Sequence, residues 1–355
     1  MTLTKVFESS VPVYKGGRFQ YLCDMILVTG ATGLLGSRLV FDLTSGGKKV
    51  RALFRNEASK AHLSRYFKGY PELLQKIEFF RGDITDIFSL QEALAGVEEI
   101  YHCAGKVSFQ PSDKEKMHHI NISGTANIVN AALDAGISKF CHVSSIAAIG
   151  RNGSSAMINE DNSWKTSVHN SEYAISKYGA EREVWRGIAE GLNAVIVNPG
   201  VIIGPGDWRT DSSMLFGQVQ RGLRFYTEGM NGFVDVRDVS TSMIQLMNSG
   251  RTGERFILVA ENKPFREVFD CIADQLHKPR PSIKAGPLLT SLAWRAEWIK
   301  SKLFGTKPVI TRETARSASG VNRYDNSRII AATGIQFIGI EKAIADAAAY
   351  FNKKD

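Results

Sequence analysis

One segment, MILVTGATGLLG at residues 25–36, constrains the possible folds of this chain more than any other. It is an apolar run that ends in a glycine-rich turn. The apolar residues predict a buried strand, and the residues after the turn predict a helix. Glycines between a strand and a helix permit a tight turn and let backbone N–H groups approach a pyrophosphate at the helix N-terminus. The spacing is G-x-x-G-x-x-G rather than G-x-G-x-x-G, but the strand–turn–helix context is the one that the motif requires. We therefore predict a dinucleotide site formed by Gly30, Thr32, Gly33, Leu34, Leu35 and Gly36.

Short apolar strands alternate with helical patterns over the first two hundred residues. Strands are expected at residues 25–30, 50–55, 76–83, 98–105, 139–145 and 193–200, with long helices at 34–47 and 120–136. Strands that alternate with helices imply right-handed crossovers and a parallel sheet covered on both faces. The predicted fold class is therefore α/β, a doubly wound parallel sheet of the Rossmann type, whose ligands bind beyond the carboxyl ends of the strands.

The alternation loosens after Pro199. We expect residues 25–200 to form the dinucleotide-binding domain, with returns to the sheet near 233–260. Residues 201–232 and 261–355 are expected to form mainly a smaller C-terminal substrate-binding cap. Residues 1–24 lack the apolar core of a signal peptide, so we expect a leader outside the fold, with Met25 as a hypothetical native start.

The composition is that of an ordinary globular protein, with 43% hydrophobic and 23% charged residues. No apolar run approaches the roughly 20 residues that a membrane span needs. The four cysteines are far apart in the sequence and form no C-x-x-C pair, which favours a reduced, cytoplasmic protein. Neither a paired cysteine set nor a histidine motif at ligand spacing occurs, so no metal site is expected.

The net charge of +8 is concentrated in one segment. Residues 278–328 hold eleven Lys/Arg and three Asp/Glu, which accounts for the whole excess. Nucleic-acid binding is not expected, because no element that would read bases accompanies the basic segment. Within it, residues 287–304 place Leu288, Leu292, Ile299 and Leu303 near one helical face, with Trp294 and Trp298 nearby and Arg295, Lys300 and Lys302 as cations.

That amphipathic segment has two interpretations. It could be an interfacial helix that contacts a membrane and admits a lipid-like substrate. The commoner arrangement is an apolar face packed over the substrate cleft with solvated cations, and this is the one we expect.

A tyrosine and a lysine lie four residues apart in SEYAISKYGAE, residues 171–181. Residues i and i+4 share one face of a helix, so Tyr173 and Lys177 can share a cleft. An ammonium beside a phenol favours its ionised form, which suits a proton donor in carbonyl reduction. Such a pair also arises by chance, so its meaning depends on the rest of the chain.

The end of the second strand bears on the choice between NAD and NADP. Arg55 stands at this strand end and Arg38 lies early in the preceding helix. An arginine accepts a ribose 2′-phosphate, whereas an acid there binds the 2′-hydroxyl. We expect NADP, with NAD as the alternative because Glu57 follows closely.

Eight motifs in order make the chain resemble the extended short-chain dehydrogenase/reductase family, with a pattern nearest to its dihydroflavonol reductase and 3β-hydroxysteroid dehydrogenase members. The resemblance runs from about residue 25 to the C-terminus. The motifs are TGATGLLG (29–36), RGDITD (81–86), YHCAG (101–105), NISGT (121–125), HVSSIAAIG (142–150), YAISK (173–177), NPGVIIGPGD (198–207) and FVDVRDVS (233–240).

The resemblance implies a role for each matching residue. Asp83 and Ile84 would hold the adenine, and Ala104, Gly105, Pro199 and Gly200 would line the rest of the cofactor. Tyr173 would be the acid/base, and Lys177 would lower its pKa and hold the nicotinamide ribose. Ser145 would hydrogen-bond the substrate oxygen, with the adjacent Ser144 as the alternative, and Asn121 would order the site.

The resemblance also bears on which reaction the protein catalyses. Before the proline of NPG, sugar-nucleotide members commonly carry an arginine, and here the residue is Asn198. We therefore favour a cytoplasmic, NADP-preferring oxidoreductase of a ketone or secondary alcohol on a small apolar-to-amphipathic molecule. A nucleotide-sugar epimerase or dehydratase with bound NAD is the alternative, and a non-catalytic cofactor sensor is the third. A homodimer is possible, since many relatives pair through helices of the nucleotide domain.

Overall fold

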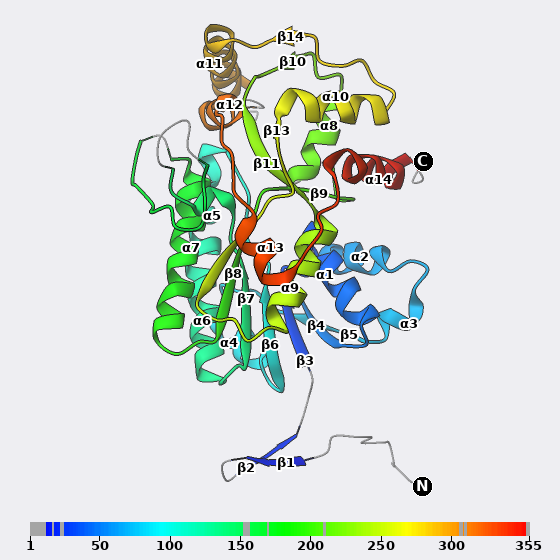
Figure 1. Ribbon diagram of the computed structural model, residues 1–355, viewed down its shortest axis with the longest axis vertical. Helices are drawn as coiled ribbons and strands as arrows, with labels where there is room; N and C mark the ends of the chain where they lie inside the picture. The colour runs from blue at the N-terminus through cyan, green and yellow to red at the C-terminus, as the bar shows by residue number, and fades with distance from the viewer. Residues whose placement is uncertain are drawn as a thin grey trace.

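The structure, a computed structural model, describes residues 12–15, 18–21, 25–151, 157–168, 170–208, 211–304, 308 and 311–352. Its centre is a parallel sheet of seven strands in the order β12-β8-β7-β6-β3-β4-β5 (Figure 1). These strands are β3 (Met25–Thr29), β4 (Lys49–Phe54), β5 (Ile77–Arg81), β6 (Val97–His102), β7 (Lys139–Val143), β8 (Ala194–Pro199) and β12 (Glu254–Leu258). The doubly wound α/β fold predicted from the sequence is confirmed.

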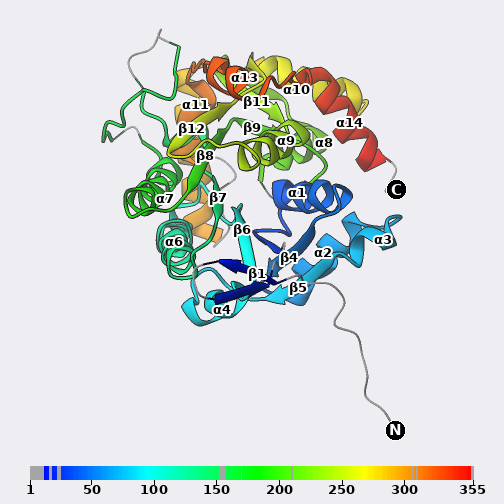
Figure 2. The ribbon, with the colours of Figure 1, turned by 60° about the horizontal axis from the view of Figure 1, so that its bottom comes forward.

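Helices cover both faces of this sheet (Figure 2). One face packs against α1 (Leu34–Ser45), α2 (Glu57–Tyr66), α9 (Val236–Met247) and α13 (Ser327–Thr333). The other packs against α4 (Ile87–Ala93), α6 (Gly124–Asp134) and α7 (Glu172–Ala189). Successive side chains of a strand point to opposite faces, so Ile26 and Val28 join the first cluster and Leu27 the second. Each such buried side chain contributes about 1.5–3 kcal/mol to folding.

The chain order reverses beside β3. The chain proceeds from β3 to β4 and β5 on one side, and then returns to β6, β7, β8 and β12 on the other. The carboxyl ends of β3 and β6 therefore flank a topological switch point, which is where ligands bind in open α/β sheets.

Smaller elements stand over the carboxyl edge of the large sheet (Figure 1). One is a three-stranded sheet with the strand order β13 (Glu261–Pro264), β11 (Met230–Asp235), β9 (Val201–Ile203). This sheet packs against the helices α8 (Met214–Gln220), α10 (Phe265–Gln275) and α14 (Ile340–Asn352). At the far end lie β10 (Phe225–Tyr226), paired with β14 (Ile283–Lys284), and the helices α11 (Pro287–Phe304) and α12 (Arg312–Ser319).

Residues 236–258 return to the large sheet as α9 and β12. Helix α13, from the segment expected to form mainly the cap, also packs on the sheet, where Ile329 is fully buried. The described part of residues 1–24, β1 (Pro12–Lys15) and β2 (Arg18–Tyr21), forms an antiparallel pair of strands that stands apart from the large sheet (Figure 1). Among the described residues, no helix has the length and apolar character needed to span a bilayer.

Candidate active site

The glycine turn after β3 packs α1 against the ends of two strands. Gly30 has a φ of +66°, in the left-handed region, and a Cβ built there would lie 2.6 Å from the backbone nitrogen of Ala104. A Cβ built on Gly36 would lie 2.1 Å from the Gly30 carbonyl oxygen. Since larger residues would collide with backbone, only glycine allows this approach. Helix α1 consequently begins at the carboxyl edge of the sheet, where its first N–H groups can meet a phosphate.

A cavity of about 160 Å³ opens beside the turn. It is lined by Thr32, Gly33, Leu34, Ser59, His62, Gly206, Asp207 and Ser213. Leu35, also predicted for this site, is instead buried in the sheet core, so only its backbone lies near the turn. Sequence reasoning missed Ser59 and His62, because the capping pattern of Asn56 marks where α2 begins but not that α2 lies over the glycine turn.

The two arginines predicted to select NADP differ in their surroundings. Arg38 forms an ion pair with Asp42 one turn later, with nitrogen–oxygen distances of 2.7 and 2.9 Å, and lies over the Phe41 ring. Arg55 follows β4 directly and is exposed. Within the described part of the chain, its guanidinium forms no hydrogen bond or ion pair, so Arg55 is the arginine that can accept a phosphate.

Asp83 and Ile84 follow β5. One carboxylate oxygen of Asp83 accepts hydrogen bonds from the backbone and the hydroxyl of Thr85, both at 2.9 Å, which fixes the side chain. Among the described residues no donor reaches its second oxygen. Ile84 is buried against Gly124, where a Cβ would lie 2.6 Å from Ile84 Cδ1. The glycine cradle, the cavity and this carboxylate oxygen together fit a dinucleotide.

Tyr173 and Lys177 lie on the first two turns of α7. Ser171 caps the helix by accepting a hydrogen bond from the Ala174 N–H at 3.1 Å. Lys177 is buried, and its ammonium donates to the carbonyl of Val143, at the end of β7, at 2.7 Å. Burial lowers the pKa of Lys177 to about 8. The Tyr173 ring makes an edge contact with Phe109 at a centroid distance of 5.8 Å.

The two serines after β7 have different hydrogen-bond partners. The Ser144 hydroxyl donates to the buried carboxylate of Glu181 at 2.5 Å. The Ser145 hydroxyl accepts from the Ala147 N–H at 3.1 Å, and no acceptor for its own proton is found among the described residues. Of the two, Ser145 therefore has a proton to offer a substrate oxygen.

Asn121 ties the loop after β6 to α7. It lies in a single π-helical stretch, His119–Ser123, a feature frequent at functional sites. Its side chain accepts from the Lys106 N–H at 2.7 Å, and donates to the Lys106 carbonyl at 3.0 Å and to the Ser176 hydroxyl at 2.9 Å. A Cβ on Gly105 would lie 3.5 Å from Asn121 Oδ1 and 3.8 Å from Lys177 Nζ. These three residues therefore converge at the switch point.

A buried carboxylate that sequence reasoning missed lies one turn beyond Lys177. Glu181 is 1% exposed and accepts hydrogen bonds from Ser144, from Asn198 at 2.8 Å, from Arg255 at 3.0 Å and from the Trp185 indole at 3.2 Å. Its position was visible in the sequence, since residues 173, 177 and 181 share a helix face. Its pairing with Asn198 and Arg255 was not, because these two residues come from β8 and β12.

Pro199 and Gly200 close the site from the end of β8. Pro199 is buried, and the Gly200 N–H donates to the Leu258 carbonyl at 3.0 Å. A Cβ on Gly200 would lie 2.4 Å from the Gly232 carbonyl oxygen. Asn198, just before them, donates to the Ser145 carbonyl at 3.0 Å and so fixes the serine loop.

Two buried histidines lie under the site. His102 Nδ1 is 2.7 Å from the Thr29 hydroxyl and Nε2 is 3.1 Å from the Thr125 hydroxyl, and its ring stacks on His142. Burial lowers the pKa of His102 to about 3, so the ring is neutral near pH 7. The described residues contain no cluster of three or more His, Cys, Asp or Glu side chains suited to a metal.

Comparison with known proteins bears on the family of this chain. The model of the NAD dependent epimerase/dehydratase family matches residues 26–259. Sterol demethylase protein B of Methylococcus capsulatus is 30% identical over 92% of this chain and 98% of its own length. A putative dihydroflavonol 4-reductase of Synechocystis is 29% identical over 93% and 95%. The crystal structure of gox2253 superposes with a TM-score of 0.77 at 28% identity, covering 93% of this chain and 98% of that one.

These findings confirm the resemblance to extended short-chain dehydrogenases/reductases. The family comprises NAD(P)-dependent oxidoreductases, epimerases and dehydratases. The match spans every strand of the large sheet and all the predicted site residues. The chain therefore belongs to the NAD dependent epimerase/dehydratase family.

Proposed function

We propose that this protein is an NADP-preferring oxidoreductase that reduces the carbonyl, or oxidises the matching secondary alcohol, of a small apolar-to-amphipathic molecule. The observation that carries the proposal is the position of Lys177. Its ammonium is buried against the Val143 carbonyl, one turn after Tyr173 and beside Gly105 at the switch point. A buried ammonium lowers the free energy of a nearby phenolate, which makes the phenol a better acid.

The residues of the site would each have a separate role in the reaction. A nicotinamide held at the switch point would supply or accept the hydride. Tyr173 would give a proton to the carbonyl oxygen during reduction and take it back during oxidation. Ser145 would donate a hydrogen bond to the same oxygen and stabilise the charge that gathers there. Asn121 would hold the Lys106 backbone and thereby the wall of the site.

Two observations favour an oxidoreductase over a sugar-nucleotide enzyme. Asn198 occupies the position where sugar-nucleotide members commonly carry an arginine, and its side chain is used internally to hold Ser145 and Glu181. Two of the relatives with nearly full-length matches are named for a sterol demethylase and a dihydroflavonol reductase, both of which imply substrates without a nucleotide.

The preference for NADP rests on Arg55. A guanidinium at the end of β4 can form charge-assisted hydrogen bonds with a 2′-phosphate, each contributing roughly 1.5–3 kcal/mol. Arg55→Asp should therefore weaken NADPH binding by about tenfold or more and leave NADH binding equal or improved, as measured by titration of intrinsic fluorescence. Arg38→Ala is the matched control, because Arg38 is paired with Asp42. An unchanged ratio of the two affinities in Arg55→Asp would refute the preference.

The reaction class is tested by offering the purified protein a panel of ketones and aldehydes with NADPH and following absorbance at about 340 nm. A reductase consumes the cofactor with a suitable ketone. An epimerase or dehydratase purifies with NAD already bound and shows no net cofactor consumption with a nucleotide sugar. A cofactor sensor binds the dinucleotide but turns over neither panel. Turnover of nucleotide sugars without net oxidation would overturn the proposal.

A further inference from the structure

Helix α11 carries a continuous apolar stripe. Leu289, Leu292, Ala296, Ile299 and Leu303 follow at alternating spacings of three and four residues, which aligns them along one face of a helix. All five are exposed, the four large side chains to 40%, 65%, 51% and 74%. Isolated exposed leucines are ordinary, but an aligned row of this kind marks an interaction surface.

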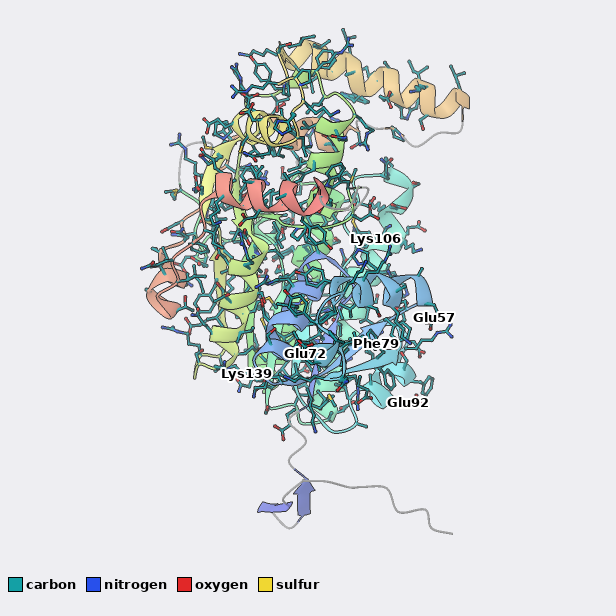
Figure 3. The ribbon with its side chains drawn as sticks, turned by 90° about the vertical axis from the view of Figure 1, so that its right-hand side faces the viewer. Glu57, Glu72, Phe79, Glu92, Lys106 and Lys139 are labelled. Atoms are coloured by element: carbon teal, nitrogen blue, oxygen red, sulfur yellow. The ribbon has the colours of Figure 1, made fainter. Side chains whose placement is uncertain are left out.

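The opposite side of α11 faces the protein. Thr290, Trp294, Glu297 and Ser301 repeat at spacings of four, three and four residues and are all half-buried. The helix therefore turns these four residues toward α12 and its apolar stripe outward, while Trp298, one turn after Trp294 on the same side, is 55% exposed. Figure 3 shows α11 projecting sideways from the end of the molecule, clear of the other elements along much of its length.

The expectation that this apolar face packs over the substrate cleft was wrong for Leu292, Ile299 and Leu303, because all three are exposed. The side chains of Leu288 and Lys302, which were assigned to the same segment, lie outside the described part of the structure.

Cations border the stripe on both edges. On a helix with roughly 100° between residues, Arg295 lies one turn before Ile299 on one edge of the stripe, and Lys300 lies between Ala296 and Leu303 on the other edge. Both are exposed; the Arg295 guanidinium lies 4.7 Å from the Trp294 ring and Lys300 lies 3.6 Å from Glu297. Long cationic side chains at such edges can lay their aliphatic stems along an apolar layer and extend their charges to its polar border.

Two short strands carry further exposed apolar side chains. Phe225 of β10 and Ile283 of β14 are paired in register and are 46% and 44% exposed. Both strands lie at the same end of the molecule as α11 (Figure 1). This end therefore combines aromatic and aliphatic side chains with the most basic segment of the chain.

The charge pattern favours a lipid surface over a second copy of the chain. Two such stripes packed together would bring their cationic edges together, and α11 has a single acidic residue, Glu297, on its inward side. Like charges across a seam oppose association. Anionic headgroups complement the same edges, and a basic helix with an apolar face is the type that lies in a bilayer interface. We infer that α11 docks this protein onto anionic membranes, with its apolar stripe among the acyl chains.

The inferred docking surface is connected to the candidate active site. On α12, the Glu313 carboxylate accepts from the N–H of Glu172, the residue before Tyr173, at 3.2 Å. Gln110 donates to the carbonyl of Pro308 at 2.8 Å. Docking through α11 would therefore hold the mouth of the site close to the bilayer, where amphipathic molecules partition.

Vesicle flotation of the full chain tests the inference. We expect the protein to float with phosphatidylcholine vesicles that contain phosphatidylglycerol, far less with phosphatidylcholine alone, and to be released at high salt. The triple variant Leu292→Ser, Ile299→Ser, Leu303→Ser should lose about tenfold or more of the binding. Arg295→Gln with Lys300→Gln should lose on the order of tenfold on anionic vesicles only. Phe88→Ser is the matched control, since Phe88 is 78% exposed on α4, at the other end of the molecule.

Three outcomes would overturn the inference: no flotation with anionic vesicles, unchanged flotation of the triple variant, or a dimer in analytical ultracentrifugation that the triple variant dissociates. The last would assign the stripe to a contact between copies. Thermal melting should confirm that each variant is folded. Because the altered side chains are exposed and distant in sequence from the site residues, turnover of a water-soluble ketone should persist in the triple variant, so failure here leaves the proposed function standing.

Discussion

At the scale of single residues, the buried ammonium of Lys177 makes stability depend on pH. Its pKa is lowered from 10.5 to about 8 in the folded protein, chiefly by burial. Between those two values the unfolded chain binds more protons than the folded one, so stability rises with pH. Relative to Lys177→Met, the free energy of unfolding of the cofactor-free protein should rise by up to about 3 kcal/mol across this window. Urea denaturation at several pH values measures it, and a difference that stays flat would contradict the assigned burial.

The buried environment of Glu181 leads to a second prediction, which concerns the free energy of unfolding. Its carboxylate pairs with Arg255 at 3.0 Å and accepts from Ser144 and Asn198. Glu181→Gln would leave a largely buried guanidinium without its counter-charge, a change that costs roughly 3–5 kcal/mol. Arg182→Gln, an exposed position on the same helix, should change the unfolding free energy by less than about 0.5 kcal/mol. Chemical denaturation of both variants checks this, and equal stabilities would show that the network contributes nothing.

At the scale of elements, the approach of α1 to β3 decides whether a dinucleotide can bind. A Cβ at Gly36 would lie 2.1 Å from the Gly30 carbonyl, so Gly36→Ala must displace the helix from the turn. We expect NADPH affinity to fall by about tenfold or more, because the helix N-terminus no longer meets the pyrophosphate. Gly46→Ala, at the other end of α1, has ordinary contacts of 3.4 Å and serves as the control. Unchanged affinity in Gly36→Ala would place the cofactor elsewhere.

The elements also show what the sequence alone could predict. The segment expected to be a strand at 50–55 is β4 at Lys49–Phe54, and that at 193–200 is β8 at Ala194–Pro199. Buried parallel strands leave apolar runs that are visible locally. The pairing of β9, β11 and β13 was not predicted, because it joins segments far apart in the chain whose local patterns are weak.

At the scale of the whole molecule, periodicity identified the amphipathic character of α11 but not which face the rest of the protein covers. That depends on how β10, β14 and α12 are placed, which no local pattern encodes. The same limit applies to the site. Motifs predicted Ser145, Tyr173 and Lys177, whereas the links from Asn198 and Arg255 to Glu181 depend on β8, β12 and α7 lying side by side.

The central claim is that a phenol, an ammonium and a serine hydroxyl act together at the switch point, beside a bound nicotinamide. It is tested most directly by comparing wild type with Tyr173→Phe, a change that keeps the ring contact with Phe109 and removes only the hydroxyl. With NADPH and a ketone that wild type reduces, we predict that kcat falls by about 10²–10⁴-fold. The Kd for NADPH should change by less than about twofold, because the phenol proton contributes to the chemical step more than it contributes to cofactor binding. Undiminished kcat in Tyr173→Phe would contradict the account.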